Sequence, residues 1–144
     1  MAVRAPATLT VLIIDDDLGF VFWLGEIFTE ASCRALPALS CGEAVVLTKR
    51  LGVEPDLIIL NASFAGASKL LQKYIQTNPY LKIVTFGPPS KALGASIHVH
   101  ATLERPSPND PIVRAEWLEK LRKLLRQVKA AGADKMQPST IRTI

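Results

Sequence analysis

The sequence predicts an α/β domain built around a five-stranded parallel sheet with helices on both faces. Three largely apolar runs, Val11–Ile14, Leu57–Leu60 and Lys82–Phe86, are typical of strands that are buried on both sides. Segments with apolar residues at helical spacing separate these runs, and the alternation repeats along the chain. Strands that alternate with helices pair in parallel through right-handed crossovers, so the pattern favours a doubly wound sheet.

The other elements are placed by periodicity and by the space between these runs. Four helices and two further strands are predicted: helices over 18–31, 42–51, 67–76 and 112–130, and short strands near 34–38 and 99–103. At most one short helix fits between the third run and the last strand, because Pro88 and Pro89 impose extended backbone there. The domain is therefore assigned to residues 10–130, between an N-terminal tail (1–9) and a flexible C-terminal tail (131–144).

Composition limits the class of protein. The chain of 144 residues is 49% hydrophobic and 21% charged, which is typical of one globular domain. No apolar run approaches the roughly 20 residues of a membrane span, and the N-terminus lacks the apolar core of a signal peptide, so we expect a cytoplasmic protein without membrane contact. Cys33 and Cys41 lack CxxC spacing and are interpreted as buried thiols rather than a disulfide or metal site.

Polar residues follow two of the predicted strands directly. Asp15, Asp16 and Asp17 come after the first strand, and Asn61 follows Leu57–Leu60. The carboxyl ends of parallel strands converge, so these side chains are expected in one crevice, where clustered carboxylates suit a hard cation such as Mg²⁺. The alternative is that Asp16 or Asp17 caps the next helix. Three carboxylates, with no glycine-rich turn, argue against a dinucleotide site.

These motifs resemble the receiver domains of two-component response regulators, over about residues 10–130. VLIIDDD is similar to the first strand of that family with its acidic pair, which corresponds to Asp15 and Asp16. LIILNASFAG resembles the strand with the phosphoacceptor aspartate, and Asn61 holds the acceptor position. NPYLKIVTFG resembles the fourth strand, where the usual Thr or Ser position falls on Gly87, and ATLERP resembles the fifth, with Arg105 in place of Lys. The resemblance implies a CheY-like, flavodoxin-like sheet with strand order 2-1-3-4-5.

An intact receiver would accept a phosphoryl group on the aspartate from a histidine kinase, with Mg²⁺ held by the acidic residues. Here Asn61 lacks the carboxylate nucleophile and removes one anionic ligand, so Asp15 and Asp16 are expected to bind Mg²⁺ weakly at most. Gly87 removes the hydroxyl that follows the phosphoryl group. We hypothesise that Arg105 bridges Asp15 or Asp16 and fixes the crevice in one state; the alternative is that it points to solvent.

Two further departures concern signal transmission. Thr102 holds the position at which intact receivers carry a Tyr or Phe that moves on activation, and the region of the fourth helix is about one turn short. The fourth helix is therefore expected to be shortened or remodelled. Together the altered positions predict a pseudo-receiver: a response regulator receiver that lacks the acceptor aspartate and is not an enzyme, needs no cofactor, and acts in phosphorelay signalling through phosphorylation-independent protein–protein contacts.

The expected partner is a signalling protein, such as a histidine kinase or another regulator. The face built by the fourth-helix region, the fifth strand and the last helix would bind it, and the pattern is also compatible with a homodimer. Its residues are Thr102, Lys120, Arg122, Lys123 and Arg126. The net charge of +4 is concentrated at the C-terminal end, where the alternative is a solvated helix face or a weak, non-specific nucleic-acid contact.

Two other interpretations stay open at this stage. An enzyme or small-ligand binder on a flavodoxin-like sheet could use a crevice formed by Asp15, Asp16, Asn61 and Arg105. The chain could also be a piece of a larger regulator. His98 and His100 share one side of the approach to the fifth strand, but without a third ligand nearby they are interpreted as loop or strand-edge residues rather than a metal pair.

Overall fold

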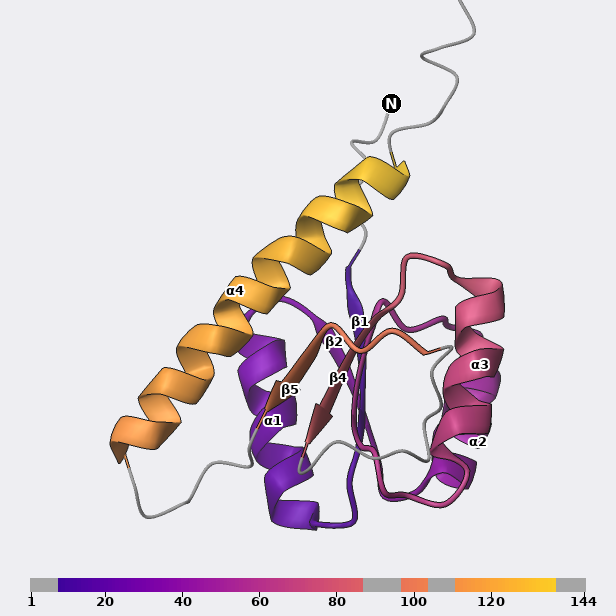
Figure 1. Cartoon of the computed structure of the whole chain (residues 1–144), viewed down its shortest axis with the longest axis horizontal. Coiled ribbons are helices and arrows are strands. Elements are labelled where there is room, and N and C mark those ends of the chain that lie inside the picture. Colours follow the sequence, from indigo (N-terminus) through magenta and orange to yellow (C-terminus); the bar gives the residue numbers. More distant parts are fainter. Residues whose placement is uncertain (1–7, 87–96, 104–110, 137–144) are drawn as a thin grey trace, which may run out of the picture.

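The computed structural model describes residues 8–86, 97–103 and 111–136. Within these ranges five strands and four helices follow one another in the predicted order (Figure 1). The elements are β1 (Thr10–Ile14), α1 (Leu18–Glu30), β2 (Arg34–Ala38), α2 (Cys41–Leu51), β3 (Leu57–Asn61), α3 (Ala67–Thr77), β4 (Lys82–Phe86), β5 (Ala101–Leu103) and α4 (Pro111–Met136).

The strands form one sheet in the order β2-β1-β3-β4-β5, and every neighbouring pair is parallel. This confirms the predicted doubly wound fold and its strand order. The register aligns Ile14 of β1 with Leu60 of β3, and Asn61 of β3 with Phe86 of β4. The residues that follow β1 and β3 are thereby brought to the same edge of the sheet.

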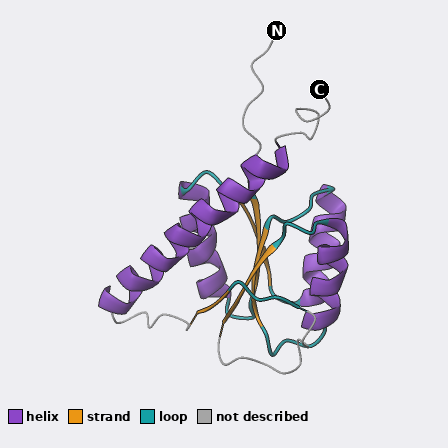
Figure 2. Ribbon diagram, turned by 45° about the horizontal axis from the view of Figure 1, so that its top comes forward, coloured by secondary structure: helices purple, strands orange, loops and turns teal. Residues whose placement is uncertain are grey.

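Each face of the sheet is covered by two helices: α1 and α4 on one side, α2 and α3 on the other (Figure 2). Side chains alternate between these faces, so Val11 and Ile13 of β1 pack toward α1 and α4, while Leu12 and Ile14 pack toward α2 and α3. All four of these residues are 0% exposed. Contiguous aliphatic strands buried on both sides explain why the sheet forms from this sequence.

Local signals set the helix ends. Asp17 caps α1, because its Oδ1 accepts a hydrogen bond from the Phe20 N–H at 3.2 Å, and Ser40 caps α2 through the Glu43 N–H at 3.1 Å. Helix α2 ends at Leu51 and is followed by the C-cap Gly52, where φ is +64°, and α3 begins after Gly66, where φ is +83°. Glycine adopts both of these conformations without the steric cost that other residues incur.

Two predicted boundaries differ from the structure by two residues or more. Helix α4 continues to Met136, six residues past the predicted end at 130, so residues 131–136 are helical rather than part of a loose tail. Alanines at 130, 131 and 133 favour the helix, and a single glycine at 132 costs only about 1 kcal/mol. Strand β5 begins at Ala101, two residues later than predicted. The region expected to hold the shortened fourth helix (87–96) and residues 1–7 and 137–144 lie outside the described residues.

In the part of the chain that the structure describes, no helix is both long enough and apolar enough to cross a membrane. Cys33 and Cys41 are both buried and no disulfide joins them, as predicted. Burial raises the pKa of the Cys41 thiol, which keeps the thiol neutral and poorly reactive at neutral pH.

Candidate functional site

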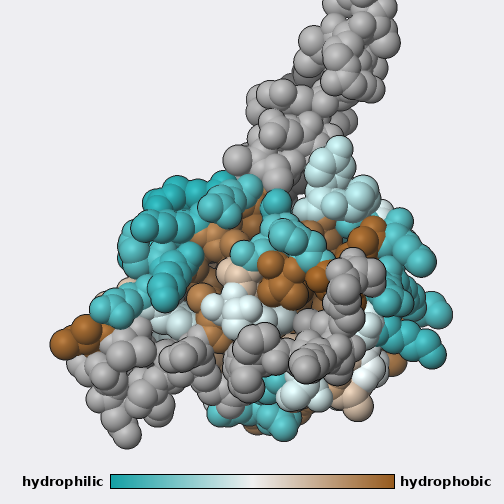
Figure 3. All heavy atoms as spheres, viewed as in Figure 1, coloured by the Kyte–Doolittle hydropathy of each residue, from teal (hydrophilic) through white to brown (hydrophobic). Residues whose placement is uncertain are grey.

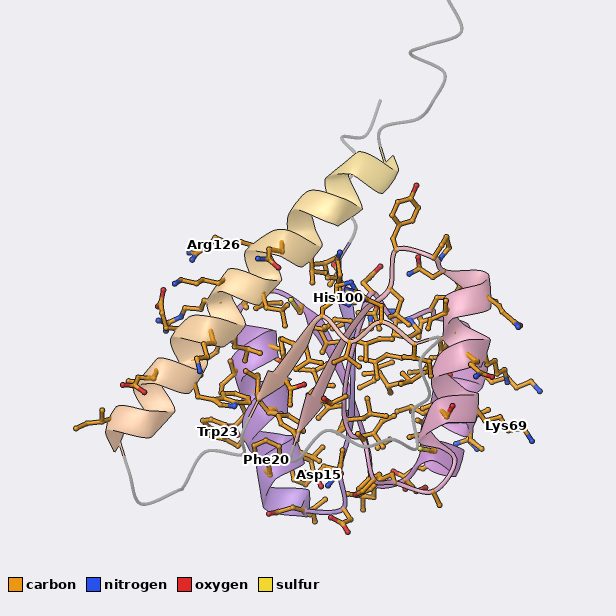
Figure 4. The ribbon with its side chains drawn as sticks, in the orientation of Figure 1. Asp15, Phe20, Trp23, Lys69, His100 and Arg126 are labelled. Carbon is orange, nitrogen blue, oxygen red and sulfur yellow. The ribbon has the colours of Figure 1, made fainter. Side chains whose placement is uncertain are left out.

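The acidic run at the end of β1 separates into three different environments. Asp15 is 0% exposed, and its backbone N–H donates to the Ala38 carbonyl of β2 at 3.1 Å. Asp16 is exposed, and Asp17 caps α1. The alternative interpretation of the run as a helix cap is therefore correct for Asp17. Asp15 lies at the carboxyl end of the strands (Figure 4), where the crevice was predicted.

Asn61 is the last residue of β3 and is half-buried beside β1. Its side-chain oxygen Oδ1 accepts two hydrogen bonds from Ser63, one from the backbone N–H at 2.9 Å and one from the hydroxyl Oγ at 2.6 Å. Its backbone carbonyl accepts the Phe64 N–H at 3.2 Å. The amide oxygen is thus engaged within its own loop, in an Asx-type turn. Sequence reasoning missed this contact, although Asn-x-Ser spacing permits it.

The side-chain oxygens at the ends of β1 and β3 do not fit a tight magnesium site. Mg²⁺ requires near-octahedral oxygen coordination, commonly with carboxylates from the protein. Two of the residues expected to supply oxygen ligands make other contacts. Asp17 accepts the hydrogen bond that caps α1, and the Asn61 oxygen accepts hydrogen bonds from Ser63. The two remaining carboxylates are the buried Asp15 and the exposed Asp16. In the described ranges there is also no group of three or more His, Cys, Asp or Glu residues that could hold a metal ion.

The ladder places an aromatic residue opposite Asn61. Phe86 pairs with Asn61 and is 1% exposed, whereas Gly87, the predicted hydroxyl position, lies outside the described residues. Neither Phe86 nor Gly87 carries a hydroxyl, and the assignment of the hydroxyl position to Gly87 stays a prediction. Thr85, one residue earlier, places its hydroxyl 3.2 Å from that of Thr102 in β5.

Thr102 is exposed on the edge strand β5, and its assignment to the aromatic switch position of the family stays a prediction. Its hydroxyl forms the contact with the buried Thr85, which is 2% exposed. Arg105 lies outside the described residues, so the hypothesis that it bridges Asp15 or Asp16 stays a prediction.

An aromatic cluster fills the core next to the crevice and joins α1, β4 and α4. The ring of Phe20 lies 5.0 Å from that of Phe86 in an edge-to-face arrangement, and the ring of Trp117 lies 6.0 Å from that of Phe86. Trp23 lies 5.6 Å from Trp117, measured between ring centroids. Figure 4 shows Phe20 and Trp23 on α1, on the side that faces α4. Helical spacing indicated that these residues face the core, but it could not indicate which rings meet.

The basic residues of α4 are on its outer surface. Lys120, Arg122, Lys123 and Arg126 are exposed, and Figure 3 shows hydrophilic side chains on the outer side of this helix. Arg122 and Arg126 lie 3.8 and 4.0 Å from Glu119. Exposed pairs at such distances contribute little to stability, so they do not fix these cations in place. The buried stripe of α4 consists of Trp117, Leu121, Leu124, Leu125 and Val128.

Two grooves lie along α1 rather than at the crevice. One, of about 370 Å³, runs between α1 and β2 and is lined by residues that include Phe22, Ala35 and Pro37. The other, of about 300 Å³, lies between α1 and α4. Neither is lined by Asp15 or Asn61. These two grooves do not test the alternative of a ligand-binding crevice at the ends of β1 and β3.

Comparison with solved structures identifies the fold. The receiver domain of an HD-domain protein from Pseudomonas fluorescens Pf-5 matches with a TM-score of 0.67 and 18% identity, covering 95% of this chain and 98% of that one. A CheY-like receiver domain from Methanospirillum hungatei JF-1 gives a TM-score of 0.64 and 20% identity, over 86% and 98% of the two chains. A two-component response regulator from Clostridium difficile gives 0.60 and 20%, over 91% and 100%. No protein-family model and no curated protein matches the sequence. The chain therefore has the CheY-like receiver fold.

Proposed function

We propose that this chain is a pseudo-receiver of bacterial-type two-component signalling. In this proposal it does not accept a phosphoryl group, it is not an enzyme, and it acts in the cytoplasm through protein–protein contacts. The observation that carries the proposal is the state of Asn61, the last residue of β3, to which we assign the acceptor position. The receiver fold supports the signalling context, and the chemistry of the crevice supports the loss of phosphorylation.

An acyl phosphate forms when a carboxylate oxygen attacks phosphorus, and an amide lacks the negative charge for this attack. The Asn61 oxygen also accepts two hydrogen bonds from Ser63, which draw electron density away from an already weak nucleophile. The aromatic Phe86 opposite Asn61 offers no hydroxyl to a phosphoryl oxygen. These three features act in the same direction.

The proposed partner face combines β5 with the outer side of α4. Its described residues are Thr102, Lys120, Arg122, Lys123 and Arg126, all of them exposed. A cluster of four cations favours an acidic surface on a signalling partner, such as a histidine kinase or another regulator. Two identical basic faces would repel each other, so a symmetric dimer through this face is disfavoured.

The first experiment tests acceptance of a phosphoryl group. We expect Mg²⁺ with beryllofluoride, a mimic of the phosphoryl group, to cause no saturable shift of the amide resonances of residues 15, 16 and 61. In Asn61→Asp we expect at most a weak response, because Gly87 and Arg105 remain altered. Tight binding by the unmodified protein would contradict the proposal.

The second experiment tests the partner face. A bait with Arg122→Glu and Arg126→Glu reverses two exposed charges on α4 at a spacing of four residues. The matched control, Lys69→Glu with Lys73→Glu, makes the same change of net charge at the same spacing on the exposed side of α3. We expect a partner identified with the wild-type bait to be lost with the α4 variant alone. Equal loss with both variants would show that only net charge matters.

A further inference from the structure

His100, the residue that precedes β5, contacts β4 through both its backbone and its side chain. Its backbone N–H donates to the Ile83 carbonyl at 2.8 Å, and its ring nitrogen Nδ1 accepts the Ile83 N–H at 3.1 Å. In a regular parallel ladder a backbone carbonyl of the neighbouring strand would accept that N–H. One residue therefore satisfies both backbone groups of Ile83, which is 1% exposed.

This arrangement requires one protonation state of the ring. A nitrogen that accepts a hydrogen bond must carry a lone pair, so the proton of neutral His100 is on Nε2. In the imidazolium both ring nitrogens are donors, and Nδ1 would then face the Ile83 N–H with a hydrogen of its own. Protonation at Nδ1 therefore breaks the bond and leaves a buried backbone donor without its acceptor.

The surroundings oppose the positive charge as well. Among the described residues, the groups that act electrostatically on His100 are Lys82 of β4 and His98, whose ring lies 4.6 Å away in an edge-to-face arrangement. Burial, followed by the charges of Lys82 and His98, lowers the pKa of His100 below its ordinary value of 6.5. His100 is thus held neutral near pH 7 and becomes charged only in more acidic solution.

We propose that His100 is a protonation-sensitive switch. Neutral His100 holds the start of β5 against β4, and protonation of its ring releases the start of β5. The release is local, because β5 has three residues and lies at the edge of the sheet, whereas β1 and β3 lie in its interior. The contact between Thr85 and Thr102 is the next side-chain link between β4 and β5. This inference does not depend on the loss of phosphorylation proposed above.

The test uses the full chain and native-state amide hydrogen exchange, with rates corrected for the intrinsic effect of pH. Between pH 7.5 and a pH below the folded pKa of His100, we expect protection of the Ile83 amide to fall at least about tenfold relative to Ile59 of β3. Ile59 reports global opening. In His100→Asn the side-chain oxygen Oδ1 can still accept from Ile83 but does not titrate, so the ratio should stay constant. His98→Asn, which removes only the neighbouring ring, should preserve the fall.

A wild-type ratio that is independent of pH, or an equal fall in His100→Asn, would overturn the proposal. A second measurement avoids dependence on the folding of a variant: nitrogen chemical shifts of the His100 ring in the wild-type protein. We expect the Nε2–H tautomer at pH 7.5 and a pKa below 6.5. An Nδ1–H tautomer, or a pKa at or above that value, would contradict it equally.

Discussion

The two ends of the parallel sheet differ in what their polar residues can do. At the carboxyl end, Asn61, which we propose holds the acceptor position, has no ionisable group, and its oxygen accepts hydrogen bonds from Ser63. At the amino end, His100 has an ionisable ring whose neutral form completes the hydrogen bonding of β4. Figure 4 shows Asp15 and His100 at these opposite ends. The residue at the end of β3 therefore cannot change its charge, whereas the residue that precedes β5 can.

The residues at the strand ends can differ in chemistry without a change in the sheet itself. Residues such as Leu12, Ile58 and Ile59 are 0% exposed, and their burial determines the fold whatever follows each strand. A similarity of fold at 18–20% sequence identity therefore gives little information about the chemistry of this protein. Function has to be argued from residues such as Asn61 and His100.

The largest expected effect is a loss of stability when Phe86, at the carboxyl end of β4, is replaced. It tests whether this side chain is part of the packed core. Phe86→Ala removes the ring that packs between Phe20 and Trp117, so we expect a loss of about 3–5 kcal/mol in the free energy of unfolding. Phe22→Ala, at a residue 57% exposed on α1, is the control and should change stability by about 0.5 kcal/mol or less. Urea denaturation followed by far-UV circular dichroism measures both. Equal losses would contradict a packed role for Phe86.

A smaller effect separates the three acids that follow β1. Asp17→Ala removes the cap of α1 and should cost about 1 kcal/mol, whereas Asp16→Ala, at an exposed neighbour without that contact, should be close to neutral. The measurement is thermal unfolding in magnesium-free buffer. A larger loss at Asp16 than at Asp17 would show that the two residues have been assigned the wrong roles.

The amino end can be tested through the pH dependence of stability. The pKa of His100 is lower in the folded protein than its ordinary 6.5, so the unfolded chain binds the proton more readily. The stabilisation from neutral His100 is then complete above pH 6.5 and is lost as the pH falls through the folded pKa. We expect urea midpoints of the wild type to decrease more steeply over this window than those of His100→Asn. Parallel curves would rule out the linkage.

The smallest effect concerns the loop after β3. Ser63→Ala removes the hydroxyl contact to Asn61 but keeps the backbone one, and the site is exposed, so we expect a loss of about 0.5 kcal/mol. Chemical denaturation at neutral pH measures it. The variant should still fail to accept a phosphoryl group from acetyl phosphate, because the amide remains. Modification of this variant alone would show that Ser63, rather than Asn61, blocks the site.

The strands could be predicted well from the sequence, because strands that are buried on both faces consist of contiguous aliphatic residues. Contiguous aliphatic residues identified β1 and β3, and the space between helices located β2. The predicted end of α4 at 130 is too early, because a glycine such as Gly132 is typical of a helix end, whereas a glycine among alanines weakens a helix without ending it. Local composition does not show how much the packing of a long helix contributes, so it could not be compared with the cost of one glycine.

The candidate site was predicted less completely, because its contacts cross between elements. That Asn61 lies at the end of β3 near Asp15 followed from the order of strands and from the family resemblance. That Phe86 lies opposite Asn61 depends on register, and that His100 binds Ile83 depends on ring orientation. Neither register nor ring orientation can be obtained from periodicity.

The central claim is that residue 61 does not carry a phosphoryl group in this fold. Its most direct test is mass spectrometry of the protein from cells with active histidine kinases, under conditions that preserve acyl phosphates, with peptides covering residues 15–17 and 61. The account predicts unmodified peptides at both places. A phosphoryl group mapped to either of them would contradict it.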